Sequence, residues 1–199
     1  MIAWINFIVL IASALLMANF YVRSVGPAEL EKQVGEAAYA RCTRYRLIAS
    51  AFEFVAMANY VVYYFHPLPV PLPRAFPWDY WISIVIAIAI GVPGGYLMWR
   101  GMKDAGEETL VTKKGHALYG GIYQRIRHPQ ALGELPLWWV GAFILNSPFL
   151  AIFSFVWIPI FYAFCRAEER DLVIRYGDTY LEYKRNTGFL IPKRRSNAE

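Results

Sequence analysis

Long apolar runs, separated by segments that hold almost all of the charge, are the feature that most limits the fold of this chain of 199 residues. Five such runs lie at about 2–22, 47–66, 80–99, 131–146 and 149–165. A bilayer core requires about 20 apolar residues per helix, a length that four of the runs approach or reach while one is shorter. The runs therefore predict an all-α, polytopic integral membrane protein with five transmembrane helical runs.

The overall composition is also that of a membrane protein. Hydrophobic residues make up 57% of the chain and charged residues 18%, whereas soluble domains average about 45–50% and about 25%. The average for soluble domains counts glycine and leaves out tyrosine. Because the chain has 14 of each, its hydrophobic fraction is 57% by either definition. No repeat or low-complexity stretch divides the sequence. We therefore predict one membrane domain, 1–199, with three spans in 1–99 and a loop, a tight helical hairpin and a tail in 100–199.

The positions of the basic residues predict how the spans are oriented. Segments 23–46 and 100–130 and the tail from 166 onward hold 19 of the 20 Lys and Arg residues. Five spans place these segments on one side, and loops rich in Lys and Arg lie on the cytoplasmic side. We therefore expect an outer N-terminus and a cytoplasmic C-terminus, in a membrane that the compact length suggests is a prokaryotic plasma membrane. The same bias accounts for the net charge of +5 without a nucleic-acid partner.

The spacing of the reactive residues excludes several common chemistries. Cys42 and Cys165 form no CxxC motif, so they indicate neither a disulfide framework nor a zinc site. His66 falls on the outer side of the predicted topology, whereas His116 and His128 lie in a Gly-rich loop without the i, i+4 spacing of a metal-binding helix. Rossmann, P-loop and nucleophile-elbow patterns do not occur in the sequence. We expect no bound metal.

Polar residues cluster instead in segment 100–192, on the predicted cytoplasmic face beside the hairpin. A loop rich in Gly, aromatic and basic residues, 115–129, precedes the hairpin, and the pair Glu168-Glu169 follows it. Such residues suit a ligand that is aromatic at one end and zwitterionic at the other, with Tyr for a ring or cation and Arg for a carboxylate. The alternative is a juxtamembrane loop whose basic residues meet lipid headgroups while the two Glu pair with neighbouring Arg. The residues alone leave both interpretations open.

The C-terminal half also carries an ordered set of short motifs. These are Gly121-Ile122-Tyr123, Arg127-His128-Pro129, Gly133, Glu168-Glu169, Leu172, Tyr176-Gly177, Tyr180, Tyr183 and Pro192. The set, which covers about 106–193, resembles the isoprenylcysteine carboxyl methyltransferase and phospholipid methyltransferase superfamily. The resemblance implies that this half binds S-adenosylmethionine between the hairpin and a cytoplasmic cap. It further implies a lipid or prenylated substrate that reaches the site sideways from the bilayer.

The resemblance assigns roles to individual residues. By this analogy the cofactor pocket is lined by His116, Leu118, Tyr119, Gly121, Tyr123, His128 and Pro129. Glu168 or Glu169 would hold the polar groups of the cofactor, and Arg127 and Arg166 are candidates to bind an acidic acceptor or the methionine carboxylate. One position departs from the pattern of the family, because Ala131 stands where an aromatic residue is usual. A neighbouring tryptophan, at 138 or 139, would have to replace that ring.

Two acids lie inside the predicted spans. A charged carboxyl at the bilayer centre costs about 2.5–3.5 kcal/mol on insertion scales, so Glu53 and Glu134 should face protein or water. Glu134 lies near the proposed cofactor and is a candidate for a catalytic role. For Glu53 we expect a structural solution, either a bound proton or a neighbouring Asn59 or Arg.

The chemistry that the resemblance implies fits this set of residues. Methyl transfer from a sulfonium is a displacement with an activated leaving group, and it depends on alignment and electrostatics more than on a nucleophilic side chain or a metal. An isoprenylcysteine-like carboxylate, the preferred acceptor, needs no base. The amine of an aminophospholipid, the next candidate, must lose a proton, which His128 or a Glu could accept.

Two rival hypotheses remain. Arg127-His128-Pro129, followed by Gly133-Glu134 and Trp138-Trp139, also resembles the C-terminal signature of membrane sterol-type reductases. Such an enzyme would use NADPH, but its usual larger bundle of spans does not occur in this sequence. A membrane binding protein without enzymatic activity is the third hypothesis, for which Ala131 is the only hint. Ligand binding separates the three hypotheses. A methyltransferase should bind S-adenosylmethionine, a reductase should bind NADPH, and a non-enzymatic protein should bind neither.

Overall fold

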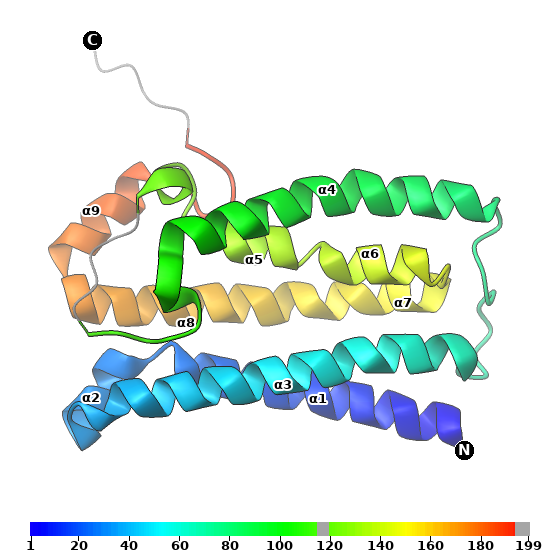
Figure 1. The fold of residues 1–199 in the computed structure, drawn as a ribbon, viewed down its shortest axis with the longest axis horizontal. Helices are drawn as coiled ribbons and strands as arrows, with labels where there is room; N and C mark the ends of the chain where they lie inside the picture. Colours follow the sequence, from blue (N-terminus) through cyan, green and yellow to red (C-terminus); the bar gives the residue numbers. More distant parts are fainter. Residues whose placement is uncertain (115–119, 194–199) are drawn as a thin grey trace, which may run out of the picture.

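The computed structural model describes residues 1–114 and 120–193, and helices dominate both ranges (Figure 1). The elements are α1 (Ile2–Ser24), α2 (Pro27–Val34), α3 (Ala37–Phe65), α4 (Tyr80–Ala105), η1 (Gly106–Thr109), η2 (Gly121–Gln124), α5 (Pro129–Glu134), α6 (Leu137–Ile144), α7 (Pro148–Phe153), η3 (Ser154–Val156), α8 (Trp157–Tyr176) and α9 (Asp178–Asn186). The η elements are short 3-10 helices. Within the described ranges, extended pairing is limited to one isolated bridge between Ile126 and Gly188. The all-α prediction is confirmed.

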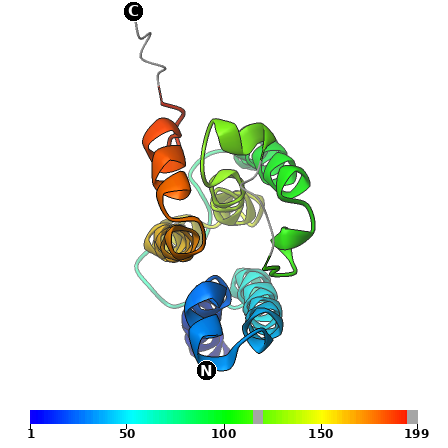
Figure 2. The ribbon, with the colours of Figure 1, turned by 90° about the vertical axis from the view of Figure 1, so that its left-hand side faces the viewer.

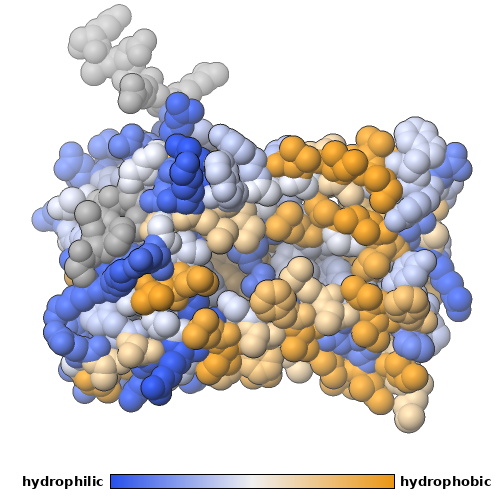
Figure 3. All heavy atoms as spheres, viewed as in Figure 1, coloured by the Kyte–Doolittle hydropathy of each residue, from blue (hydrophilic) through white to orange (hydrophobic). Residues whose placement is uncertain are grey.

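Four helical segments are long and apolar enough to cross a membrane. They are Ile2–Ser24, Ala37–Phe65, Tyr80–Thr109 and Pro148–Tyr176. Their outer faces expose large apolar side chains, among them Ile8, Phe54 and Val92. Figure 3 shows hydrophilic residues gathered mainly at the end of the molecule that carries α2 and α9, with apolar residues over much of the remaining surface. The chain is thus a multi-pass helical membrane protein.

The fourth predicted run is interrupted. α5 ends at Glu134 and α6 begins at Leu137, because Pro136 has no N–H with which to continue the hydrogen-bond ladder of α5. The stretch from Pro129 to Ile144 measures about 24 Å at 1.5 Å rise per helical residue. Since a bilayer core is about 30 Å thick, a fifth full crossing stays a prediction.

The helices form two groups that meet along α8 (Figures 1 and 2). α1 and α3 pack on each other, α4 packs on α5 and α6, and α8 contacts α1 and α2. α4 and α5 lie very close, because a Cβ atom added at Gly133 would be 2.3 Å from the backbone nitrogen of Met98. A Cβ atom at Gly94 would be 2.9 Å from the carbonyl oxygen of Gly133. Glycine at these positions therefore sets the spacing of the two helices that carry the segment around His128.

The predicted helical hairpin is present as α6 and α7, which pack together across a tight turn. Asn146 has a positive φ of 50°, and the side-chain oxygen of Ser147 caps α7 by accepting the backbone N–H of Leu150 at 3.3 Å. The following helix is fixed to α3 by a buried hydrogen bond of 3.0 Å, donated by Trp157 Nε1 to Tyr60 Oη. These contacts hold the hairpin against the first helix group.

The two ends of the bundle differ in character. The N-terminus and the connection 66–79 lie at one end, whereas α2, α9, η1 and η2 gather at the opposite end (Figure 1). The second end brings together residues from both halves of the sequence. It holds the pocket described next.

Candidate functional site

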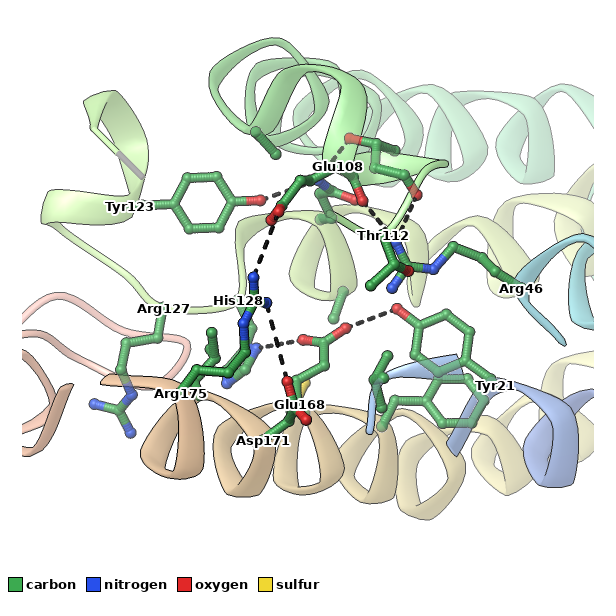
Figure 4. Close-up of a pocket in the computed structure, with 18 of the residues that line it drawn as sticks. Tyr21, Arg46, Glu108, Thr112, Tyr123, Arg127, His128, Glu168, Asp171 and Arg175 are labelled. Carbon is green, nitrogen blue, oxygen red and sulfur yellow. Dashed lines mark hydrogen bonds and ion pairs between the residues drawn. The ribbon is translucent and has the colours of Figure 1, made fainter. Parts of the chain in front are cut away.

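A pocket lies at the end of the bundle that carries α2 and α9, between the two helix groups (Figure 4). Its wall is formed by Tyr21, Val25, Pro27, Arg46, Ala105, Glu108, Thr109, Thr112, Tyr123, Arg127, His128, Gln130, Ala131, Glu134, Phe161, Phe164, Cys165, Glu168, Asp171, Leu172, Arg175, Tyr176, Tyr180 and Tyr183. About 1210 Å³ of empty space lies among these residues, counted with the part open to solvent. The wall combines apolar and aromatic side chains with a few charged ones, which is the usual lining of a small-molecule site.

The two consecutive glutamates of α8 have different surroundings, because successive residues of an α-helix point about 100° apart. Glu168 lines the pocket, and its side chain is 31% exposed. Glu169 is 2% exposed and lies outside the pocket wall. The helix geometry therefore gives one acid to the pocket and the other to the interior of the protein.

Glu169 is the centre of a cluster of positive charges. Its carboxylate lies 2.7 Å from Arg127 Nε and 2.6 Å from Lys184 Nζ. His128 Nε2 and Arg166 Nη1 each lie 3.4 Å away. Arg127 also donates to two backbone carbonyls at the end of α9. The protein itself satisfies this carboxylate, which fastens the segment before α5 to the C-terminal helix.

Glu168 belongs to a second network, which faces the pocket. It accepts a hydrogen bond of 2.8 Å from Tyr21 Oη and lies 3.2 Å from His128 Nδ1 (Figure 4). Burial disfavours a charge on His128, but its hydrogen bonds with Cys165, Glu168 and Glu169 outweigh burial and raise the pKa of His128 to about 11. His128 is therefore a cation at neutral pH. It holds the two glutamates apart and fixes the orientation of the Glu168 carboxylate.

Arg46 of α3 extends into the pocket from the opposite wall (Figure 4). Its Nη1 donates to the carbonyl oxygens of Glu108 at 2.6 Å and Thr109 at 3.3 Å. Its Nε is buried without a hydrogen-bond partner among the described residues, and no described carboxylate forms an ion pair with it. Arg175, by contrast, lies 3.7 Å from Glu108 and 3.9 Å from Asp171. Since a buried charge is stable only when it is paired, Arg46 is the pocket cation best placed to bind an anionic ligand.

Two tyrosines shape the wall between η2 and α9. Tyr123 Oη accepts a hydrogen bond of 2.9 Å from Gln130 Nε2, and Tyr183 Oη donates to the carbonyl of Tyr123 at 2.6 Å. Burial raises the pKa of Tyr123 well above its ordinary value and that of Tyr183 to about 12. Both phenols therefore stay neutral and serve as hydrogen-bonding, aromatic surface.

The residues predicted from the sequence are placed as follows. The pocket is lined by Tyr123, Arg127, His128, Glu134 and Glu168. Gly121, Pro129, Arg166 and Glu169 lie outside its wall. His116, Leu118 and Tyr119 lie outside the described residues.

The residues outside the wall have local roles that the structure shows. Gly121 has φ of 60°, and a Cβ atom there would lie 2.1 Å from the carboxylate of Asp104, which also accepts the backbone N–H of Ile122 at 2.8 Å. Pro129 begins α5 and is fully buried. The side chain of Arg166 is 46% exposed and is directed at Glu169. Gly121, Pro129 and Arg166 therefore belong to the structure around the pocket and not to its wall.

The two tryptophans expected to replace the ring that is missing at Ala131 are not part of the pocket wall. Ala131 lines the pocket, whereas Trp138 and Trp139 do not. Trp138 instead stacks on Trp157 in the core, with 3.7 Å between the ring centroids. The apolar wall is supplied from α8, where Phe164 stacks on Tyr21 at 4.1 Å.

The sequence analysis missed Tyr21 and Arg46. Both lie in the first half of the chain, where no motif pointed to chemistry. One signal was available for Arg46, because it lies three residues before the buried Ala49 and ten before the buried Ala56. That spacing puts a basic residue on the inward face of α3.

Fold and site together define a class: a multi-pass helical membrane protein with a charged pocket at one end of its bundle. The sequence model of the phospholipid methyltransferase family matches residues 79–179, which is half of the chain and most of the pocket wall. The chain belongs to the phospholipid methyltransferase family.

Curated relatives match parts of the chain. Protein-S-isoprenylcysteine O-methyltransferase of Saccharomyces cerevisiae is 34% identical over 120 residues, which cover 56% of this chain and 49% of the yeast protein. Methanethiol S-methyltransferase 1 of Bradyrhizobium diazoefficiens is 37% identical over 80 residues, covering 38% of this chain and 26% of that protein. Methanethiol S-methyltransferase of Mycobacterium tuberculosis is 33% identical over 98 residues, covering 49% and 36%. The chain thus spans between a quarter and a half of the length of these relatives. No solved structure gives a significant match.

Proposed function

We propose that this protein is an S-adenosylmethionine-dependent methyltransferase whose acceptor is a lipophilic molecule that reaches the pocket from the bilayer. The observation that carries the proposal is one pocket whose wall combines the polar residues Glu168, His128 and Arg46 with the apolar residues Phe161 and Phe164. The polar side suits a zwitterionic nucleoside, and the apolar side suits a hydrocarbon chain. The family match and the named relatives support methyl transfer over the reductase and non-enzymatic alternatives.

The charged residues of the pocket suit the charges of the methyl donor. S-adenosylmethionine supplies an activated methyl group on a sulfonium, so the chain has to bind, orient and exclude water. Arg46, with its unpartnered buried Nε, would hold the methionine carboxylate. Glu168, which lies beside the His128 cation, would accept hydrogen bonds from the amine or from ribose hydroxyls. Aromatic faces such as that of Tyr123 would border the positive sulfonium.

Three acceptor classes are compatible with this assignment. The carboxylate of an isoprenylcysteine-like lipid is the first, in line with the yeast relative. Arg127 and Arg166 are poor candidates to bind it, because both are directed at Glu169. A thiol is the second, in line with the methanethiol relatives. An aminophospholipid amine is a third acceptor to test.

We further propose that the pocket end faces the cytoplasm, in a prokaryotic plasma membrane, with the N-terminus outside. The segments that hold 19 of the 20 basic residues include α2, η2 and α9, all of which gather at this end (Figure 1). The bias of Lys and Arg toward the cytoplasmic side supports this orientation.

Calorimetric titration of the detergent-purified protein with S-adenosylhomocysteine tests the proposal, with NADPH as the parallel ligand. We expect micromolar binding of S-adenosylhomocysteine and none of NADPH. Arg46→Gln and Glu168→Gln should each weaken binding by about 10-fold or more, since each removes a charged hydrogen bond worth about 1.5–3 kcal/mol. Lys32→Gln, on the exposed face of α2, is the matched control and should leave the affinity unchanged. Binding of NADPH alone, or of neither ligand, would refute the proposal.

A further inference from the structure

One residue of the pocket wall carries a buried hydroxyl group that the described part of the chain leaves unpaired. Thr112 lines the pocket and is 8% exposed. Its Oγ1 forms no hydrogen bond within residues 1–114 and 120–193. Nearly all buried polar atoms in proteins have a partner, because a buried donor without one is unfavourable. An unpaired hydroxyl in a pocket wall therefore points to a partner that a ligand supplies.

The backbone around Thr112 is fixed to α3. The N–H of Thr112 donates to Thr43 Oγ1 at 3.2 Å, and the Thr43 hydroxyl in turn donates to a carbonyl one turn earlier on α3. Nearly one turn later, Arg46 Nη1 donates to two backbone carbonyls of η1. α3 thus holds segment 108–112 at both ends, and Figure 4 shows Thr112 beside the guanidinium group of Arg46.

Arg46 brings a second unpaired donor to the same part of the wall. Its Nε is buried and has no hydrogen-bond partner among the described residues. Because Nη1 is bound to carbonyls, the N–H groups left as a pair are those of Nε and Nη2, on one edge of the planar guanidinium. A carboxylate can bind such an edge through both of its oxygens. Each oxygen can accept one more hydrogen bond, which the Thr112 hydroxyl is able to donate.

Two acids of the pocket wall are already paired with other cations. The carboxylate of Glu108 lies 3.7 Å from Arg175, and that of Glu168 lies 3.2 Å from His128. No carboxylate in the part of the chain that the structure describes forms an ion pair with Arg46. The positive charge of Arg46 is therefore available to an anionic group of a ligand.

We infer that the Thr112 hydroxyl and the Nε edge of Arg46 together bind the carboxylate of the methyl donor. This inference rests on the proposed function and adds to it a second binding residue, which lies outside every motif of the sequence. The amino-acid end of the donor then lies against α3 and the segment that follows η1. Because hydrogen bonds to α3 hold both residues before a ligand binds, little conformational freedom is lost on binding.

The test measures the affinity of the detergent-purified protein for S-adenosylhomocysteine and for its decarboxylated form, which keeps the nucleoside, the thioether and the amine. Thr112→Val removes the hydroxyl with little change of shape. Loss of a hydrogen bond to a charged group should weaken the binding of S-adenosylhomocysteine about 10-fold and leave the affinity for the decarboxylated form unchanged. Thr112→Ser keeps the hydroxyl and should bind both ligands as the wild type does. Thr179→Val, at an exposed position of α9, is the matched control.

Two further measurements distinguish a ligand contact from a structural role. Without ligand, Thr112→Val should unfold at the wild-type temperature or above it, because the substitution removes a buried hydroxyl that has no partner. The affinity lost in the Arg46→Gln/Thr112→Val double variant should be smaller than the product of the two single losses, because both residues act on one carboxylate.

Several outcomes would overturn the inference and leave the methyltransferase proposal standing. These are equal losses of affinity for both ligands in Thr112→Val, no loss for either, or a lower unfolding temperature of that variant without ligand. A wild-type protein that binds the decarboxylated form as tightly as S-adenosylhomocysteine would also overturn it, since the carboxylate would then contribute nothing. A wild-type protein that does not bind S-adenosylhomocysteine would overturn both the inference and the proposed function.

Discussion

Because Glu169 lies at the centre of a cluster of positive charges, we expect it to stabilise the fold and not to bind the ligand. Glu169→Gln removes the anion that faces Arg127, whose side chain is 7% exposed. Removing one partner of a buried ion pair costs about 3–5 kcal/mol. Lys184 and Arg166 are 32% and 46% exposed, so losing their pairing adds at most about 1 kcal/mol each. Because Arg127 keeps its bonds to two carbonyls, we expect a total near the lower limit, about 3 kcal/mol.

Chemical denaturation in detergent, followed by tryptophan fluorescence, measures this loss. Glu168→Gln is the matched comparison, because the same substitution one residue earlier changes an acid that is 31% exposed. That variant should lose only about 1 kcal/mol of stability while binding S-adenosylhomocysteine about 10-fold more weakly. Glu169→Gln should show the reverse at a temperature where it is still folded, with low stability and an affinity within a few-fold of the wild type.

A free energy of unfolding of Glu169→Gln within 1 kcal/mol of the wild-type value would contradict this prediction. The prediction also fails if a fully folded Glu169→Gln loses binding to the same extent as Glu168→Gln. Either result would mean that Glu168 and Glu169 do not have separate roles in ligand binding and in fold stability.

Three other variants test the packing and the charges. Gly133→Ala should lower the free energy of unfolding by about 1–3 kcal/mol, because its new Cβ would lie 2.3 Å from a backbone nitrogen of α4. A Cβ at Gly95 meets nothing within 4 Å, so Gly95→Ala should be neutral or slightly stabilising. Thermal unfolding measures both. The pKa of His128 is about 11 in the folded protein and about 6.5 when unfolded, so its stabilisation is complete below about pH 6.5 and decreases as the pH rises toward 11. The unfolding midpoint of the wild type should therefore fall more between pH 7 and 10 than that of His128→Gln. Tyr60→Phe leaves the buried Trp157 N–H without its acceptor and should cost about 1–3 kcal/mol in denaturant titration, with an unchanged m-value.

The spans were predictable because their signal is local. Apolar runs of span length and the basic segments between them are visible in any window of the sequence, and helices occupy each predicted run. The boundaries were less predictable. The last run was predicted to end at 165, where charged residues begin, but α8 continues to Tyr176. The charges of its final turns face partners within the protein, such as Lys184 for Glu169, so they do not end the helix.

The candidate site was predictable only in part, for a related reason. The residues around Arg127 and Glu168 were found because they form short motifs with a recognisable order. Tyr21 and Arg46 form no motif, and Tyr21 meets Glu168 across 147 residues of sequence. Contacts over such distances depend on how α1 and α3 pack against α8, which a single sequence does not encode in any local pattern.

The division of the pocket wall between two helix groups has an evolutionary consequence. Tyr21 and Arg46 come from the pair α1 and α3, which precedes the region matched by the family, while the remaining charged wall comes from within or next to it. α1 and α3 pack chiefly on each other, so substitutions on their inward faces can accumulate without disturbing how the second group folds. Chimaeras that exchange residues 1–65 between homologues would therefore exchange Tyr21 and Arg46 together and leave the part of the wall inside the family match unchanged.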